Sequence, residues 1–192
     1  IFLYTKFNHA TIVDSKMTMA VYEYVDFSHA ILINSKFWVS RFNYPKFNNA
    51  KIIKSFLGET ILFADFSNAI LSSSIIDNKI ENTKFYKSNI INTSFGELGY
   101  PRVRGLSKTK IVNSDFTFSV IKKSRFFANI FNTNFSNAKI THVKFIMDFT
   151  NHLNFSNTIL TDSSFIECTL TNVNFTNANL TNVNFQKAKF QN

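Results

Sequence analysis

Large apolar residues recur along this chain at a beat of five positions, and the beat is organised into longer units. A phenylalanine opens each unit in phrases such as FNHATI, FSHAIL and FSNAKI. Successive copies lie 19 or 20 residues apart, with one interval of 31. The copies begin at Phe7, Phe27, Phe47, Phe66, Phe85, Phe116, Phe135, Phe155 and Phe175. A fixed period of this length predicts a stacked repeat architecture rather than a conventional globular fold.

Each unit contains four sets of five residues, and within a set a small residue stands two places before the large apolar one. The second set centres on Ile12, Leu32, Ile52, Leu71, Ile90, Ile121, Ile140, Leu160 and Leu180. The third centres on Met17, Phe37, Leu57, Ile76, Phe95, Phe126, Phe145, Phe165 and Phe185, mostly after Ser. The fourth is looser, with Tyr22, Phe42, Leu62, Ile80, Ile111, Ile130 or Phe131, Phe149 or Thr150, Leu170 and Phe190. Four-residue steps in this set account for the 19-residue units.

A period of five fits neither an α-helix nor a flat strand, whose periods are 3.6 and 2. It fits a square coil in which five residues make one side and one corner. Equivalent residues of successive coils would then stack at about 4.8 Å, the spacing of hydrogen-bonded strands. We therefore expect about nine coils, with one large side chain per side pointing inward beside a small one. The phenylalanines should form a stacked column along the axis.

These residues resemble the pentapeptide-repeat family, whose motif is commonly written A(D/N)LXX. AILIN at 30–34, AKITH at 138–142 and ANLTN at 178–182 stand close to it, and VNFTN at 173–177 is a Phe-centred version. The resemblance implies an all-β fold, a right-handed quadrilateral parallel β-helix, and it does not imply one function. It covers residues 1–192 as a single domain, except for an inserted loop at about 97–107.

Charge adds a second regularity. The residue before each first-set Phe alternates between Lys and Asp and then becomes Asn: Lys6, Asp26, Lys46, Asp65, Lys84, Asp115, Asn134, Asn154 and Asn174. Stacked coils would make these residues neighbours, so we expect a ladder of ion pairs that fixes the register. The net charge of +9 nevertheless leaves unpaired basic residues. An anionic partner, either nucleic acid or an anionic membrane, is therefore one alternative.

The outward positions of the second set suggest a partner-binding surface. Aliphatic residues directly precede or follow the inward centres, and they should stack as a strip: Val13, Ile31, Ile33, Ile53, Ile70 and Ile91, with Val120 and Ile159 further along. A second candidate lies in the inserted loop, where Arg102 and Arg104 supply positive charge on a segment of the kind that often carries recognition.

Catalytic chemistry is not indicated. The sequence has no phosphate-binding Gly-rich loop, no Cys/His metal spacing and no nucleophile elbow. We therefore predict neither a cofactor nor a metal, and not an enzyme. The single cysteine, Cys168, excludes an internal disulfide and favours the cytoplasm or, for a secreted protein, a reducing host cytosol.

The favoured function is a non-enzymatic protein-interaction scaffold with a protein partner. Because the chain begins with Ile1 and the repeat runs to Asn192 without a capping helix, we expect a β-helical domain of a larger bacterial protein, such as a secreted effector. The family suggests one alternative, a DNA-mimicking protein that binds gyrase or topoisomerase, as in quinolone resistance. An end-to-end homodimer also stays open.

Overall fold

The protein is described by a computed structural model that covers residues 1–96 and 109–192. These residues contain no helix long and apolar enough to cross a membrane. Their strands form two parallel sheets. One contains, in order, β2 (Thr11–Val13), β4 (Ile31–Ile33), β6 (Lys51–Ile53), β8 (Ile70–Ser72), β10 (Asn89–Ile91), β13 (Val120–Lys122), β16 (Lys139–Thr141), β19 (Ile159–Thr161) and β21 (Asn179–Thr181).

The second sheet bends around a corner of the molecule. Its main path is β1 (Phe2–Leu3), β3 (Val21–Glu23), β5 (Lys36–Asn43), β7 (Phe56–Leu62), β9 (Ile75–Glu81), β12 (Lys110–Val112), β15 (Asn129–Phe131), β18 (Thr150–Asn151), β20 (Thr169–Thr171) and β22 (Lys189–Gln191). A branch beside β9 adds β11 (Ser94–Phe95), β14 (Arg125–Phe127) and β17 (Lys144–Ile146).

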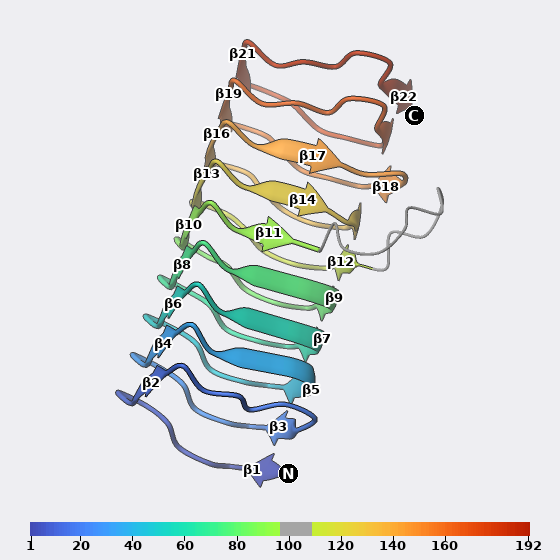
Figure 1. The fold of residues 1–192 in the computed structure, drawn as a ribbon. Coiled ribbons are helices and arrows are strands. Elements are labelled where there is room, and N and C mark those ends of the chain that lie inside the picture. Colours follow the sequence, from blue (N-terminus) through green and yellow to red (C-terminus); the bar gives the residue numbers. More distant parts are fainter. Residues whose placement is uncertain (97–108) are drawn as a thin grey trace.

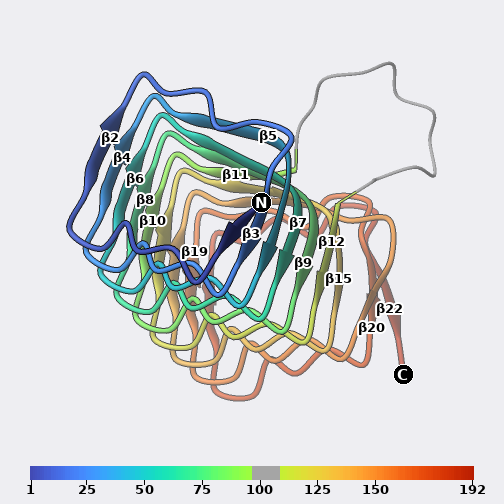
Figure 2. The same ribbon diagram turned by 90° about the horizontal axis from the view of Figure 1, so that it is seen from below.

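The coils stack into a four-sided rod, seen from the side in Figure 1 and along its axis in Figure 2. Wall 1 holds the first-set phenylalanines and is joined by isolated bridges such as Lys6 to Asp26. Wall 2 is the nine-stranded sheet. The other sheet supplies wall 3, with the third set, and wall 4, with the fourth; the long strands β5, β7 and β9 span both. The predicted quadrilateral β-helix is confirmed.

One column of aromatic rings runs the length of the rod, and a second runs beside it from Phe95 to Phe185. First-set rings stack in parallel from coil to coil, as Phe27 does on Phe47 with centroids 5.0 Å apart. Phe126 and Phe145 stack in the same way in the second column, also at 5.0 Å. The columns meet edge to face, as where Phe116 contacts Phe126 at 5.6 Å. Edge-to-face contact suits the ring quadrupole, and this explains why the interior demands Phe rather than aliphatic residues alone.

Most of the small inward residues before the third set are serines, and their hydroxyl groups bond to the backbone. The Ser35 Oγ accepts a hydrogen bond from the Ser15 backbone N–H at 3.4 Å and donates to the Ile33 carbonyl at 3.0 Å. Ser55 and Ser74 continue this ladder one coil at a time. A buried backbone N–H without a partner is costly, so each hydroxyl satisfies a group that a strand does not.

The corners of the coil place non-glycine residues at positive φ. Asn is the commonest of them, as at Asn49 and Asn137, with φ of 59° and 58°. Asn tolerates this conformation better than most L residues, which explains the Asn-rich composition. Val39 has a φ of 53°. Its side chain is branched at the β-carbon, and residues of this type disfavour positive φ more strongly than Asn does.

The structure settles the loose fourth set. Tyr22, Phe42, Ile61, Ile80, Ile111, Ile130, Thr150, Leu170 and Phe190 stand in register. The choice of Leu62 was wrong, because Ile61 is buried and Leu62 is not. The register of β5 and β7 shifts between Phe37 and Ser40, where the later coil is one residue shorter. Ile130 and Thr150 hold the inward places, whereas Phe131 and Phe149 do not.

The predicted ladder of residues on wall 1 is present, but the ion pairs predicted between them are not formed in the described residues. All nine of its positions are bridged coil to coil. Among the residues that the structure describes, however, no Lys–Asp pair of this ladder comes within ion-pair distance. The Asp26 carboxylate instead accepts the Ser28 backbone N–H at 2.9 Å, and Asn134 does the same for Ser136 at 3.0 Å. Desolvation raises the pKa of Asp26, but the Ser28 hydrogen bonds and nearby lysines outweigh it, so the pKa is lowered.

Candidate functional site

Wall 2 presents two columns of outward side chains, because each of its strands has one outward residue on either side of the inward one. Column A contains Thr11, Ile31, Lys51, Ile70, Asn89, Val120, Lys139, Ile159 and Asn179. Column B contains Val13, Ile33, Ile53, Ser72, Ile91, Lys122, Thr141, Thr161 and Thr181. Successive members of a column are direct neighbours in the sheet.

The structure brings all eight aliphatic residues predicted on this wall onto one face. Column B runs unbroken through Val13, Ile33 and Ile53, with Ile31 beside them in column A. Beyond Ile53 the strip is interrupted by Ser72, although Ile91 follows in the next coil. Val13 and Ile70 are 46% and 36% exposed, while Ile31, Ile33, Ile53 and Ile91 are half-buried. The apolar surface is therefore contiguous over the first three coils and intermittent after them.

Wall 2 is also positively charged. Its outward positions include eight Val or Ile residues, three Lys residues and no Asp or Glu. The lysines are Lys51, Lys122 and Lys139, and all three are exposed. A partner that covers this face therefore meets aliphatic surface and cationic groups together.

Further basic residues gather where wall 2 turns into wall 3. Lys122, Lys123 and Arg125 follow one another in one coil, and Lys144 lies in the next. Arg125 and Lys144 are directly paired in the sheet, so two like charges face each other. Such pairing is unfavourable in itself. The other predicted basic residues, Arg102 and Arg104, lie outside the described residues.

A stack of exposed aromatic rings was missed by sequence reasoning. Tyr4, Tyr24, Tyr44 and Phe63 occupy the corner after wall 4, with successive centroids 5.1, 4.9 and 4.6 Å apart. Desolvation, the neighbouring tyrosines and Glu23 raise the pKa of Tyr24. In the sequence, the signal for this stack was the recurrence of an aromatic residue about once per 20-residue unit. The ring faces stack on one another, so mainly the ring edges and the tyrosine hydroxyl groups are left exposed for contact with a partner.

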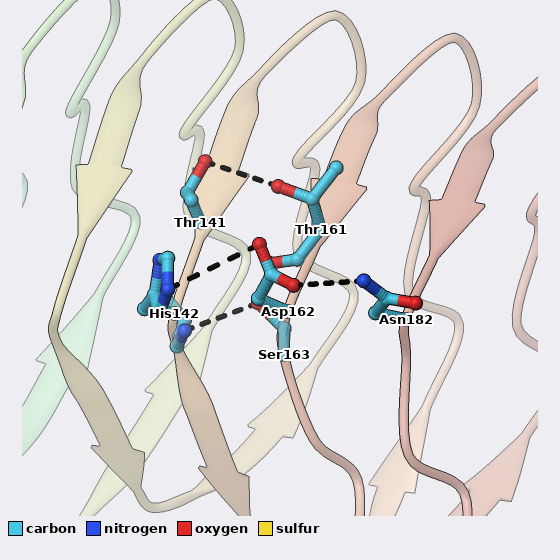
Figure 3. Close-up of polar contacts among 7 residues, drawn as sticks. Thr141, His142, Thr161, Asp162, Ser163 and Asn182 are labelled. Carbon is cyan, nitrogen blue, oxygen red and sulfur yellow. Dashed lines mark hydrogen bonds and ion pairs between the residues drawn. The ribbon is translucent and has the colours of Figure 1, made fainter.

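The corner after wall 2 holds a short polar ladder, shown in Figure 3. Asp162 lies between His142, whose Nε2 is 4.0 Å from Oδ2, and Asn182, whose amide donates to Oδ1 at 3.2 Å. The ladder borders a shallow depression of about 320 Å³ that Lys144 also lines. His142 and Asp162 are 60% and 41% exposed, so their attraction is weakened by solvent. The geometry is that of a surface ion pair rather than an activated dyad.

In the described part of the chain, the other reactive side chains lie singly or in pairs. Among residues 1–96 and 109–192, no three His, Cys, Asp or Glu side chains are grouped so as to hold a metal ion. His9 and His29 occupy equivalent positions in adjacent coils, and their rings stack with centroids 4.8 Å apart. Cys168 is buried, and burial raises its thiol pKa to about 11. A thiol in that state is a poor nucleophile.

Taken together, the coils define a parallel β-solenoid repeat protein whose flat walls carry columns of outward side chains. A family model described as Pentapeptide repeats (8 copies) matches residues 158–192. This match confirms the resemblance to the pentapeptide-repeat family that the sequence showed. No curated protein shows significant sequence similarity to the chain.

Solved structures of pentapeptide-repeat proteins are similar to this one. HetL, involved in heterocyst differentiation regulation in the cyanobacterium Nostoc sp. strain PCC 7120, is 17% identical, with 95% of this chain and 90% of HetL covered and a TM-score of 0.46. A trypsin-treated form of QnrB1, a plasmid-mediated fluoroquinolone resistance protein, is also 17% identical, with 100% and 92% covered and a TM-score of 0.47. At these identities and scores the likeness carries no functional inference.

Proposed function

We propose that the protein is a non-enzymatic scaffold that binds a partner protein through wall 2. The observation that supports this proposal is the set of eight outward Val and Ile residues on one sheet. The fold itself does not need them. Thr141, Thr161 and Thr181 occupy column B in other coils with the same strand pairing. An aliphatic surface that the fold does not require is typical of a binding site.

The experiment compares two double variants in affinity capture from a lysate of the source cells. Ile33→Asp with Ile53→Asp places charge in the unbroken part of column B. Ile75→Asp with Ile166→Asp makes the same chemical change at outward positions away from wall 2. We expect the first variant to lose a partner that the wild type and the second variant retain. Equal capture by both variants would refute the proposal, provided that circular dichroism shows both to be folded.

A second candidate function is electrostatic binding of a nucleic acid or an anionic membrane. The paired Arg125 and Lys144, with Lys122 and Lys123 nearby, support it because their mutual repulsion would be relieved by an anion. Binding of a DNA duplex or of phosphatidylserine vesicles should then weaken steeply with salt, and an Arg125→Ala, Lys144→Ala variant should bind less. Unchanged binding by that variant would rule out this cluster.

Mimicry of DNA is the weaker alternative. A duplex mimic presents an acidic surface, whereas the net charge here is +9 and wall 2 carries lysines. A supercoiling assay with purified gyrase tests it directly, and we expect no inhibition. Membership of the scaffold in a larger bacterial, effector-like protein stays a prediction from the sequence.

A further inference from the structure

Column A of wall 2 alternates between two kinds of side chain over the whole length of the rod. Apolar residues stand on every second coil, at Ile31, Ile70, Val120 and Ile159. Polar residues stand on the coils between them, at Thr11, Lys51, Asn89, Lys139 and Asn179. A repeat of one coil gives no reason for a period of two. The one-coil repeat therefore does not by itself account for the alternation.

The charge and chemistry of this column favour a protein segment. Its charged members, Lys51 and Lys139, have no acidic residue among the outward positions of the wall. Aliphatic side chains lie between them, as Val120 and Ile159 do on either side of Lys139. Nucleic-acid surfaces instead use aromatic side chains as stacking platforms for bases. An acidic peptide that also carries aliphatic residues matches both features.

The spacing selects the conformation of that peptide. Two coils rise about 9.6 Å, because neighbouring strands lie about 4.8 Å apart. A polyproline II helix repeats its side-chain direction every three residues, or about 9.3 Å. Seven residues of an α-helix rise about 10.5 Å, and a strand repeats at about 6.8 Å. From Ile31 to Ile159 the mismatch grows to about 1 Å for polyproline II and about 3 Å for an α-helix.

We propose that column A is a docking track for an acidic polyproline II segment of a partner protein, lying along the rod axis across the strands. This inference rests on the proposed function and names the chemistry of its partner. An aliphatic side chain at every third position packs on Ile31, Ile70, Val120 and Ile159. Acidic side chains at an intervening position meet Lys51 and Lys139. A polyproline II helix has three rows of side chains along its axis, and two of these rows can contact a flat wall at once.

Fluorescence anisotropy with labelled peptides tests this assignment. The probe is a peptide of four Val-Glu-Pro triplets, and its control is a scrambled peptide of the same composition without the three-residue period. We expect the triplet peptide to bind about ten-fold tighter or more, which corresponds to about 1.4 kcal/mol. A Val-Lys-Pro version should not bind measurably. Equal affinity for the triplet and scrambled peptides would overturn the inference.

Variants locate the site. Ile70→Thr with Val120→Thr keeps β-branched side chains in the strands, so the fold is preserved while the aliphatic contacts are lost. Ile75→Thr with Ile166→Thr is the matched control on wall 3. We expect loss of triplet binding only in the first variant. Tighter binding of a single-stranded DNA 20-mer or of phosphatidylserine vesicles, abolished by the same variant, would contradict the assignment to a peptide.

The result separates this inference from the proposed function. If no peptide preference is found but Ile33→Asp with Ile53→Asp still abolishes capture of a partner protein, the polyproline II assignment fails and the scaffold stands. If neither effect is found, both fail.

Discussion

The rings of Phe135 and Phe155 lie parallel at the axis of the rod, with centroids 4.8 Å apart and an interplanar angle of 7°. Phe145 meets Phe135 edge-on at 6.1 Å and 90°. Truncating Phe135 to Ala would open a cavity in a region that cannot collapse, because the coils above and below fix its walls. We expect Phe135→Ala to lower the free energy of unfolding by about 3–5 kcal/mol, measured by urea denaturation.

Phe118 supplies the control for that loss. It is 51% exposed at a corner with a φ of 57°. Phe118→Asn should change the free energy of unfolding by no more than about 0.5 kcal/mol. Similar losses for the two variants would contradict the stacked-column account of stability.

Asp65 tests whether wall 1 is held by hydrogen bonds or by ion pairs. Its carboxylate accepts the Ser67 backbone N–H at 2.9 Å, the same contact that Asn154 makes with Ser156 at 3.0 Å. Asp65→Asn should therefore be nearly neutral, whereas Asp65→Ala should cost about 1 kcal/mol. Thermal denaturation at low and high salt distinguishes the two explanations. An equal, salt-sensitive loss in both variants would favour ion pairs instead.

Val39 offers a test of the corner geometry, because a β-branched residue there is strained. We expect Val39→Asn to raise the free energy of unfolding by about 1 kcal/mol. Asn137→Val makes the reverse change at a corner with a φ of 58° and should lower it by a similar amount. Chemical denaturation of both variants measures the pair. Destabilisation by Val39→Asn would show that its side chain is held by contacts that outweigh the backbone strain.

The sequence was sufficient for the fold because the interior is specified residue by residue. Phe27 or Ile52 can point only inward once the five-residue beat is recognised, and both do. The fourth wall was ambiguous because adjacent apolar residues, such as Ile61 and Leu62, satisfy the beat equally well. Only the strand register shows which of them is inward.

Surface features were harder to predict because several contacts satisfy the same pattern. Alternating charges such as Asp26 and Lys46 suggested ion pairs, whereas a backbone N–H two residues along is the nearer partner of the carboxylate. The stack of exposed aromatic rings that begins at Tyr4 was missed because the five-residue beat identifies inward positions and carries no information about the corner residues. The aliphatic residues of wall 2 were found because they flank the inward centres directly.

Alkaline pH should destabilise the protein through Cys168. Burial raises the pKa of its thiol from 9.0 to about 11, so the folded state disfavours the thiolate. A raised pKa contributes stability that is fully present below the unfolded-state value and is lost as pH rises through the folded-state value. We expect the free energy of unfolding to fall between about pH 9 and 11, by an amount on the order of 3 kcal/mol.

Cys168→Ala is the matched variant for this prediction, because Ala20 and Ala188 stand at the equivalent place in other coils. The fall above pH 9 should be smaller in this variant. Tyr22 leaves a residual decrease between about pH 10 and 12, since burial raises the pKa of its hydroxyl from 10.0 to about 12. A pH profile identical to that of the wild type would show that the thiol does not contribute.

Photo-crosslinking tests most directly whether wall 2 is the binding face. Benzoylphenylalanine is placed at the position of Ile53 on wall 2 or at the position of Ile75 on wall 3, and the protein is irradiated in a lysate of the source cells. We predict one discrete crosslinked partner from position 53 and none from position 75. The same crosslinked species from both positions, or a partner from position 75 alone, would contradict the account.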